Sequence, residues 1–142
     1  MTPPADLARK LGIRPGMVVA LVDAPAGARA AIRGSAPAGV RWKNTLGAAR
    51  LDLIFFWPKK IAGLSRQFAL LQDALDPDGA VWAVMPKKAY APSRGIRFTW
   101  EEMQAEGLRG DLVDNKVASI TDTDYGTRFV VRKDRRARRT VG

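Results

Sequence analysis

Uninterrupted apolar runs alternate with amphipathic stretches along the 142 residues of this chain. Residues 17–22, 51–57 and 80–85 are apolar at nearly every position. Runs of this length without polar alternation are typical of strands that are buried on both faces of a parallel sheet. Pro58 and Pro86 follow the second and third runs, and proline cannot continue a central strand, so both strands are predicted to end there.

Amphipathic segments between these runs predict helices. Thr2 can cap a short helix over residues 2–11, which Gly12 ends. The alanine-rich stretch 26–33 predicts a second helix. A third helix has apolar residues at every third or fourth position, which places Ile61, Leu64, Phe68, Leu71 and Leu75 on one stripe. The turn residues 76–79 are predicted to end it.

The C-terminal third predicts a loop, a helix and a hairpin. Residues 87–98 have no periodic pattern and predict the loop. Thr99 and Glu102 have the spacing of a capping box, which predicts a helix that starts there and ends near Gly107. An antiparallel hairpin follows. Its strands are predicted at 116–121 and 127–132, and its turn at 122–126.

Residues 39–43 predict a short edge strand, and only residues 44–50 separate it from the strand at 51–57. Seven extended residues reach about 23–25 Å, which leaves no room for a crossover helix. Either this half of the fold is shortened or 39–43 is not a parallel strand. The order of elements predicts a three-layer α/β/α sandwich with a mostly parallel sheet that ends in an antiparallel hairpin. We expect one Rossmann-like domain over 1–132 and a basic, disordered tail over 133–142.

Composition excludes several classes of chemistry. The chain has no histidine and no cysteine, which excludes Ser-His-Asp and Cys-His nucleophiles, thiol redox couples and zinc sites built from nitrogen and sulfur ligands. We expect no metal site. The first residues lack the apolar core of a signal peptide, and the densest apolar run is too short to span a bilayer. The sequence therefore predicts a cytoplasmic protein without a membrane partner.

The charge is distributed unevenly, for a formal net charge of +10. Residues 1–71 hold 11 basic and 3 acidic side chains, whereas residues 72–131 hold 7 basic and 10 acidic ones. Residues 132–142 add six basic side chains and one acidic side chain. Such a pattern permits nucleic-acid or anionic-ligand binding through the first half. A solvated surface with a solubilising tail explains the same pattern.

A proline followed by two lysines occurs after two of the predicted strands, in Trp57-Pro58-Lys59-Lys60 and in Met85-Pro86-Lys87-Lys88. If these strands are parallel neighbours, the four lysines meet at the carboxyl edge of the sheet, where open α/β sheets bind ligands. Together with Asp23 and Gly27 after the first strand, they form a candidate site for an anion. The candidate residues are Lys59, Lys60, Lys87, Lys88, Asp23 and Gly27. Prolines that end strands and lysines that solvate strand ends explain the pattern without a ligand.

Other distinctive side chains have structural explanations. Trp57 and Trp82 lie in predicted buried strands, so we expect them in the core rather than on a base-stacking platform. Trp100, in the first turn of a helix, can cover the sheet. Asp122 and Asp124 lie at the hairpin turn, where local hydrogen bonding explains aspartate better than a bound cation does.

The order of elements resembles the Rossmann-like fold of class I S-adenosylmethionine-dependent methyltransferases, which end in a helix and an antiparallel hairpin. The strand beginning Leu51-Asp52-Leu53, the segment ALDPDGAVWAVMP and the hairpin KVASITDTDYGTRFVV carry this resemblance. The chain also resembles an uncharacterised bacterial domain-of-unknown-function family. That likeness rests on LARKLGIRPGMVVALVDAP, DGAVWAVMPKK and GLRGDLVDNKVASITDTDYGTRFVVRK. It implies a fold but no mechanism, because that family has no established activity.

Three functional motifs of methyltransferases are altered in this sequence. The glycine-rich turn that lets the backbone approach the cofactor is replaced by Asp23-Ala24-Pro25-Ala26-Gly27, with a single glycine. The acidic residue that holds the ribose hydroxyls after the second strand is replaced by cations in Val40-Arg41-Trp42-Lys43. The catalytic tetrapeptide of some amino-methylating members is replaced by Trp57-Pro58-Lys59-Lys60. These departures imply that cofactor binding and catalysis are lost.

We therefore predict a methyltransferase-like binding or interaction module, with no catalytic residues and no cofactor, whose basic crevice takes an anionic ligand or an acidic protein. Two alternatives stay open. The first is a divergent methyltransferase that binds S-adenosylmethionine at Asp23–Gly27. The second is a nucleic-acid-binding protein that uses the lysine pairs and the arginine tail. The arginines of that tail are Arg135, Arg136, Arg138 and Arg139.

Overall fold

The computed structural model describes residues 4–47 and 50–135 of the chain. Its elements are α1 (Pro4–Leu11), β1 (Val18–Val22), α2 (Ala26–Ser35), β2 (Arg41–Lys43), β3 (Leu51–Phe56), α3 (Leu64–Ala74), β4 (Leu75–Pro86), the 3₁₀ helices η1 (Lys88–Tyr90) and η2 (Pro92–Arg94), α4 (Trp100–Gly107), β5 (Leu112–Ser119) and β6 (Asp124–Val131).

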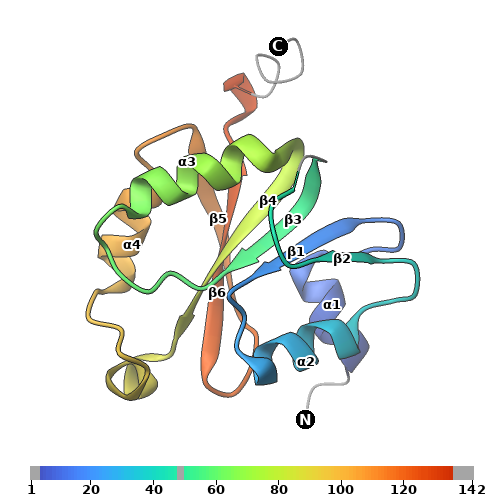
Figure 1. The fold of residues 1–142 in the computed structure, drawn as a ribbon, viewed down its shortest axis with the longest axis horizontal. Coiled ribbons are helices and arrows are strands. Elements are labelled where there is room, and N and C mark those ends of the chain that lie inside the picture. The colour runs from blue at the N-terminus through green and yellow to red at the C-terminus, as the bar shows by residue number, and fades with distance from the viewer. Residues whose placement is uncertain (1–3, 48–49, 136–142) are drawn as a thin grey trace.

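The described strands form one six-stranded sheet in the order β2-β1-β3-β4-β6-β5 (Figure 1). β1 is parallel to β2 and β3, and β3 is parallel to β4, whereas β6 is antiparallel to both β4 and β5. α1 and α2 cover one face of the sheet, and α3 and α4 cover the other (Figure 1). The predicted α/β sandwich with a mostly parallel sheet and an antiparallel end is confirmed.

β2 is the short edge strand predicted within 39–43. It pairs with β1 in parallel register, with Val18 opposite Arg41 and Ala20 opposite Lys43. The chain then crosses past β1 to β3 without a helix in the described part of this connection. Of the two sequence-based alternatives, the structure therefore supports a shortened half of the fold with a genuine parallel edge strand.

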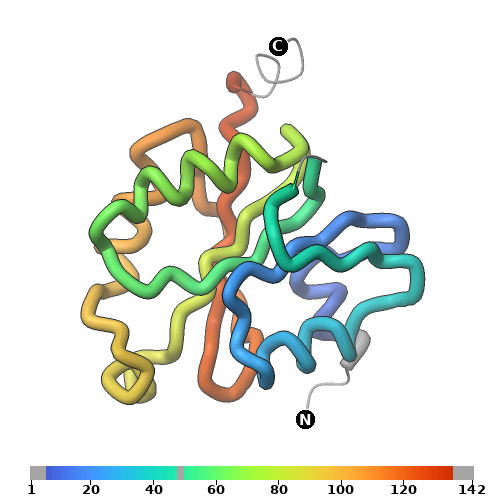
Figure 2. Tube along the Cα trace, in the orientation of Figure 1, coloured from blue at the N-terminus to red at the C-terminus, as the bar shows by residue number. Residues whose placement is uncertain are grey.

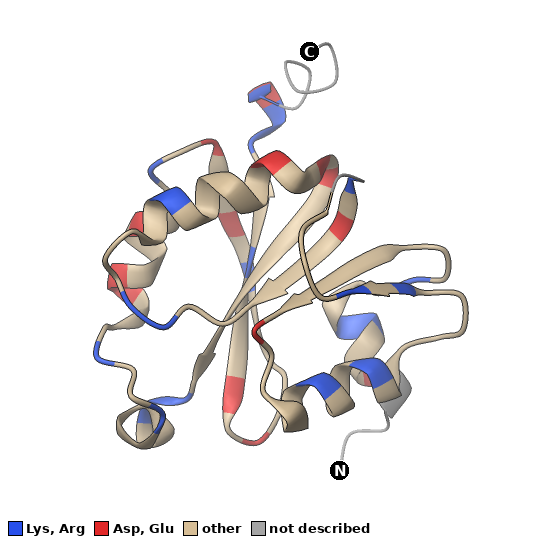
Figure 3. Cartoon of the chain, in the orientation of Figure 1, with Lys and Arg blue, Asp and Glu red and all other residues tan. Residues whose placement is uncertain are grey.

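The N-terminal elements form one side of the molecule. α1, β1, α2 and β2 lie together in space (Figure 2). Lys and Arg predominate over Asp and Glu on these elements (Figure 3). The first part of the basic half, residues 4–43, therefore lies on one side of the molecule.

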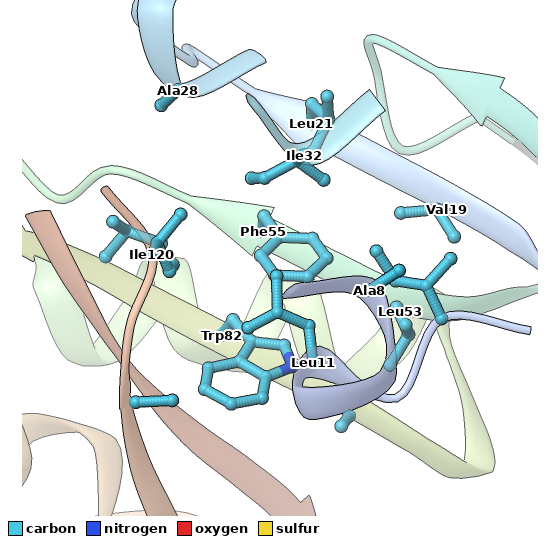
Figure 4. Packing of buried hydrophobic residues seen from close by; sticks show 14 of the residues in the cluster. Ala8, Leu11, Val19, Leu21, Ala28, Ile32, Leu53, Phe55, Trp82 and Ile120 are labelled. Atoms are coloured by element: carbon cyan, nitrogen blue, oxygen red, sulfur yellow. The ribbon is translucent and has the colours of Figure 1, made fainter. Parts of the chain in front are cut away.

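An apolar core lies between the sheet and the α1–α2 layer. Leu11 of α1 and Ile32 of α2 pack in one cluster with Phe55 and Trp82 from the sheet (Figure 4). The rings of Phe55 and Trp82 are stacked, with centroids 5.9 Å apart and planes 7° apart. Trp82 is fully buried and Trp57 is only 5% exposed, which confirms the prediction that both belong to the core.

A second core fills the space between the sheet and the α3–α4 layer. Phe68 of α3 meets Phe56 and Phe129 edge-on, with centroid distances of 5.2 and 5.0 Å. Because Phe55 belongs to the first core and Phe56 to the second, adjacent residues of β3 are buried on opposite faces. This two-sided burial is the reason that the strand is apolar at consecutive positions.

The turn predicted over 76–79 lies inside a strand, which corrects the expected element boundaries. β4 begins at Leu75, which pairs with Leu51, and the β3–β4 ladder then shifts register. The backbone N–H of Asp78 donates a 2.9 Å hydrogen bond to the carboxylate of Asp76 within this segment. The turn chemistry is as predicted, but it forms a bulge in β4 rather than a connection between α3 and a later strand.

The hairpin is longer than the sequence pattern predicts. β5 begins at Leu112 and β6 at Asp124, inside the predicted turn. A register shift between Asp114 and Lys116 breaks the alternation of β5, so the early part of the strand lacks a strand-like pattern. The predicted loop 87–98 contains η1 and η2. No helix in the described part of the chain is long and apolar enough to cross a membrane.

Candidate ligand-binding crevice

A crevice of about 370 Å³ lies at the carboxyl edge of the parallel strands, where β1, β3 and β4 end. We call it the carboxyl-edge crevice. Its lining residues are Asp23, Ala24 and Pro25 after β1, Trp57, Pro58 and Lys59 after β3, and Val84, Pro86, Arg94, Gly95 and Ile96 from β4 and the loop that follows. This edge is where open α/β sheets bind ligands, because the loops that follow parallel strands converge there.

Asp23 makes the turn from β1 into α2. Its φ of 59° lies in the left-handed region, and it is the single non-glycine residue with positive φ in the described ranges. Aspartate tolerates this conformation better than most residues because its short side chain can hydrogen-bond locally, yet the backbone cost is still on the order of 1 kcal/mol. The side chain is exposed at the rim of the crevice.

The N-terminus of α2 lies beside the same crevice. Its N-cap residue, Pro25, has extended backbone angles and provides no side-chain hydrogen bond to the first turn. The first N–H groups of a helix have no partner within the helix and carry a partial positive charge. The start of α2 therefore adds positive potential at this edge, on the same side as Arg94 and Lys59.

Arg94 is held at the crevice by a buried carboxylate. Its guanidinium donates to both oxygens of Asp124, at 2.7 and 3.1 Å. The indole N–H of Trp57 and the hydroxyl of Thr123 donate to the same carboxylate, at 3.2 and 2.9 Å. Asp124 is 2% exposed, whereas 31% of the Arg94 side chain remains exposed. The network therefore fixes one edge of the guanidinium and leaves part of the group accessible.

Burial by itself raises the pKa of the Asp124 carboxyl, but hydrogen bonds from Arg94, Thr123 and Trp57 and the charge of Arg94 outweigh it. The net effect holds the pKa of Asp124 below its usual value. The hydrogen bond to Asp124 likewise raises the pKa of Arg94 against the opposing effect of burial. Both members of the pair are therefore charged at neutral pH.

The predicted lysine pairs are separated by the structure. Lys59 lines the carboxyl-edge crevice, whereas its exposed neighbour Lys60 is not in the lining. Lys87 is half-buried, and its backbone N–H donates to the carbonyl of Thr123 at 2.6 Å. Lys88 lines an adjoining cavity of about 230 Å³ together with Trp100 and Tyr125. One predicted lysine of the four is thus placed at the crevice itself.

The remaining predicted residues lie at the margins or elsewhere. Gly27 lines a cavity of about 310 Å³ that shares Pro25 and Arg94 with the crevice. Arg135 lies 3.7 Å from the Asp111 carboxylate and is not in the crevice lining. Arg136, Arg138 and Arg139, with the rest of 136–142, lie outside the described residues.

Two residues that no sequence pattern brought together form an ion pair at the crevice: Arg94 lines it, and Asp124, outside the lining, holds Arg94 in place. Arg94 falls in a segment predicted only as a loop, and Asp124 was expected to serve the hairpin turn. Asp122 remains exposed in that turn, but Asp124 is the first residue of β6 and opposes Pro86. The expectation of local hydrogen bonding at Asp124 is confirmed by the bond from Thr123, but the same carboxylate also binds Arg94 and Trp57 from other segments, which was not expected. The position of Asp124 beside strand-forming residues was the sequence signal that could have indicated these contacts.

Trp100 and Trp42 occupy different environments. The Trp100 indole N–H donates to the hydroxyl of Thr127 in β6 at 2.8 Å, so this ring covers the sheet as expected. Trp42, on the edge strand, is half-buried beneath the guanidinium of Arg33, which lies 5.3 Å from the ring centroid. This cation–π contact occupies one face of the ring.

No protein-family model matches the sequence, and no curated protein matches it. Solved structures show what the fold is similar to. The N-methyltransferase NodS from Bradyrhizobium japonicum aligns with a TM-score of 0.56 and 12% identity over 92% of this chain and 94% of that one. A SAM-dependent methyltransferase from Aquifex aeolicus aligns with a TM-score of 0.59 and 13% identity over 90% of this chain and 89% of that one. The pyocyanin biosynthetic protein PhzM aligns with a TM-score of 0.65 and 13% identity over 90% of this chain and 54% of that one.

At these identities the likeness shows the fold alone: the chain has a class I methyltransferase-like fold. The residues present do not reproduce the cofactor site expected of such enzymes. Asp23, with its side chain, occupies the left-handed turn position after β1. β2 begins with exposed Arg41 and ends with exposed Lys43, and it offers no acid for ribose hydroxyls.

Proposed function

We propose that the protein binds a small anionic molecule in the carboxyl-edge crevice and acts as a binding module rather than as an enzyme. The observation that carries this proposal is the placement of Arg94, which lines the crevice while Asp124 holds it in place. A guanidinium carries five N–H donors in a planar fork, and Asp124 engages one edge of it. The remaining donors are oriented before a ligand arrives, which reduces the ordering cost of binding.

Lys59 and the start of α2 support the same proposal. Lys59 reaches the lining from the turn after β3, and Pro25 brings the N-terminus of α2 to it from the turn after β1. Ammonium, guanidinium and helix N-terminus all stabilise a carboxylate or a phosphate. Three separate segments therefore contribute positive potential to one cavity.

Asp23 restricts the class of ligand. Its carboxylate lies on the rim and favours a hydrogen-bond donor such as a hydroxyl or an amino group. Trp57, Pro58 and Ile96 supply apolar walls. We infer a ligand that combines one anionic group with hydroxyl or amino donors and an apolar part. A volume of about 370 Å³ is within the range of small-molecule sites.

The lining supports binding better than catalysis. Among the described lining residues Asp23 is the one acid, and the sequence contains no histidine or cysteine. Nucleophilic catalysis needs a group that activates the nucleophile, such as an adjacent base. A lone rim carboxylate beside a lysine is suited to recognising a ligand.

A divergent methyltransferase is the second candidate. The observation that favours it is the position of the crevice, which lies after β1 beside a left-handed turn in a methyltransferase-like fold. Under this alternative Asp23 contacts the cofactor, so its replacement by alanine would abolish binding of S-adenosylmethionine. The altered turn and the cationic end of β2 count against it.

The test is calorimetric titration of the full chain with citrate, inorganic phosphate and S-adenosylmethionine. Lys59→Gln and Lys60→Gln form a matched pair, because they remove the same charge from adjacent exposed positions and only Lys59 lines the crevice. We expect Lys59→Gln to weaken binding of the anion about fivefold or more and Lys60→Gln to weaken it less than about twofold. Equal weakening, or no heat from citrate and phosphate, would overturn the proposal. Heat from S-adenosylmethionine alone that is lost in Asp23→Ala would favour the methyltransferase.

A further inference from the structure

The segment 24–51, which contains α2 and β2, has no acidic residue. Its basic residues are Arg29, Arg33, Arg41, Lys43 and Arg50. Asp23 and Asp52 flank the segment, and the Asp52 carboxylate already accepts a 2.8 Å hydrogen bond from the backbone N–H of Val18. Surfaces with both signs of charge interspersed avoid a large field of one sign. A segment with cations alone therefore calls for an explanation.

Two contacts hold the arginines of α2 against β2 and the residue that follows it. The guanidinium of Arg29 donates a 2.8 Å hydrogen bond to the side-chain oxygen of Asn44. The guanidinium of Arg33 lies 5.3 Å from the ring centroid of Trp42. Because Arg29 and Arg33 are four residues apart in a helix, they lie on the same side of α2. Both arginines are thereby oriented toward the edge of the sheet.

Arg41 and Lys43 add two cations on the other face of β2. Trp42 packs against the core on the α1–α2 side, and consecutive residues of a strand point to opposite faces. Arg41 and Lys43 are exposed, and β2 is the edge strand of the sheet (Figures 1 and 3). Cations therefore lie on both sides of this edge. We call Arg29, Arg33, Arg41 and Lys43 the α2–β2 basic surface.

Protection of the sheet edge explains part of this arrangement. Charged side chains on an edge strand prevent pairing with another chain, which accounts for Arg41 and Lys43. It does not account for the arginines of α2, since like charges four residues apart destabilise a helix. The ion pairs of the described residues include none of the four cations of this surface. A negatively charged partner would supply the compensation that the chain itself does not provide.

The accessibility of aromatic rings indicates the kind of polyanion. Trp42 is half-buried, because Arg33 covers one face of its ring and the ring also packs against the core. The exposed large hydrophobic side chains of the described ranges all lie on other elements. Single-stranded nucleic acids bind by stacking their bases on accessible aromatic rings. A duplex keeps its bases stacked and presents its phosphates, so the α2–β2 basic surface suits a duplex better.

We propose that the α2–β2 basic surface binds the phosphate backbone of double-stranded DNA without recognising the base sequence. Guanidinium and ammonium groups donate charge-assisted hydrogen bonds to phosphate oxygens, and such contacts carry no sequence information. The four cations belong neither to the predicted lysine pairs nor to the C-terminal arginines. None of them lines the carboxyl-edge crevice, so this proposal is independent of the ligand of that crevice.

The experiment measures binding of a fluorescently labelled DNA duplex to the full chain by anisotropy, at several salt concentrations around 0.15 M. The test variant is Arg41→Gln with Lys43→Gln. The matched control is Arg66→Gln with Arg97→Gln, which removes two positive charges from exposed positions on α3 and before α4. Charges more than about 8 Å from the DNA are largely screened at this salt concentration, so the control pair should weaken binding less than about threefold.

We expect the test pair to weaken binding about tenfold and to reduce the slope of log affinity against log salt by about two, since two phosphate contacts are lost. Equal weakening by the two pairs, or no binding of the duplex, would overturn the proposal. It would also be overturned if polyglutamate displaced the duplex as effectively as unlabelled duplex does, which would favour an acidic protein, or if a single strand bound more tightly than the duplex.

Two further variants keep the test decisive. Lys59→Gln, in the carboxyl-edge crevice, should change duplex binding less than about twofold, so failure of this proposal and failure of the proposed function are distinguishable. If circular dichroism shows that the test pair unfolds, Lys43→Gln alone, at an exposed position, must still weaken binding and reduce the salt slope by about one.

Discussion

Arg94 and Asp124 are 30 residues apart in the sequence, yet two hydrogen bonds of 2.7 and 3.1 Å join the guanidinium to both carboxylate oxygens. The pair ties the loop after β4 to the first residue of β6. Trp57 and Thr123 complete the set of donors to the carboxylate. One buried carboxylate thereby connects three segments at the wall of the carboxyl-edge crevice, so its removal should affect stability and the shape of the crevice together.

Asp124→Asn should lower the free energy of unfolding by about 2 kcal/mol, because the amide nitrogen cannot accept a hydrogen bond from Arg94 or Trp57. Because 31% of the Arg94 side chain is exposed, the loss of unfolding free energy should be smaller than for a fully buried ion pair. Chemical denaturation of the full chain measures it. Asp122→Asn, at the exposed turn next to this site, is the matched control and should change stability by less than about 0.5 kcal/mol. Similar losses in the two variants would show that the network adds nothing.

The same pair predicts a pH dependence. The pKa of Asp124 in the folded protein lies below the unfolded value of about 3.9. Its ionisation therefore contributes stability that is fully present above about pH 4 and is lost as the pH falls through the folded-state pKa. The stability difference between the natural chain and Asp124→Asn should be largest near neutral pH and should shrink below about pH 4. Denaturation at several pH values tests this, and a difference that grows toward acid would contradict it.

The capping box of α4 makes a separate prediction. The Thr99 hydroxyl accepts from the Glu102 N–H at 3.1 Å, and the Thr99 N–H donates to the Glu102 carboxylate at 2.9 Å. Thr99→Ala removes the first of these bonds and should cost about 1 kcal/mol of unfolding free energy. Thr45→Ala, at an exposed position outside any helix, should cost almost nothing. Equal midpoints for the two variants in thermal unfolding would refute the role of the cap.

Local patterns in the sequence predicted the elements whose causes are local. β3 is buried on both faces, so its apolar run is visible without knowledge of its partners. α3 presents Leu64, Phe68 and Leu71 to the core at helical spacing, and α4 begins at a cap whose two partners are three residues apart. In each case the sequence signal lies within a few residues of its structural effect.

The crevice wall depends on contacts that no local pattern contains. Arg94 lies in a loop without periodicity, and its partner is on another strand, so nothing near it in sequence identifies the pair. Adjacent residues also differ in direction: Lys59 lines the crevice and Lys60 does not, although the sequence motif treats them alike. The prediction for the Asp-Pro-Asp-Gly segment was wrong for a related reason. The same turn residues occur in a bulge within a strand and in a turn that connects a helix to a strand.

The bulge of β4 provides the last prediction, which concerns Gly79. A Cβ at this position would lie 2.5 Å from the backbone carbonyl oxygen of Asp52 and 2.9 Å from Cδ1 of Leu75. Because the nearer atom belongs to the backbone of β3, the two strands must separate to accept a methyl group. We therefore expect Gly79→Ala to lower the free energy of unfolding by about 1–3 kcal/mol.

The matched control is Gly34→Ala, where a new Cβ in α2 would meet no atom within 4 Å. Alanine is the better helix former, so this substitution should leave stability unchanged or raise it by roughly 0.5–1 kcal/mol. The two variants add the same methyl group and differ only in the space that receives it. Chemical denaturation should therefore show a loss of stability in Gly79→Ala and no loss in Gly34→Ala. If Gly79→Ala were as stable as Gly34→Ala, the close approach of β3 and β4 at the bulge would be wrong, and with it the register that aligns the ends of both strands at the crevice.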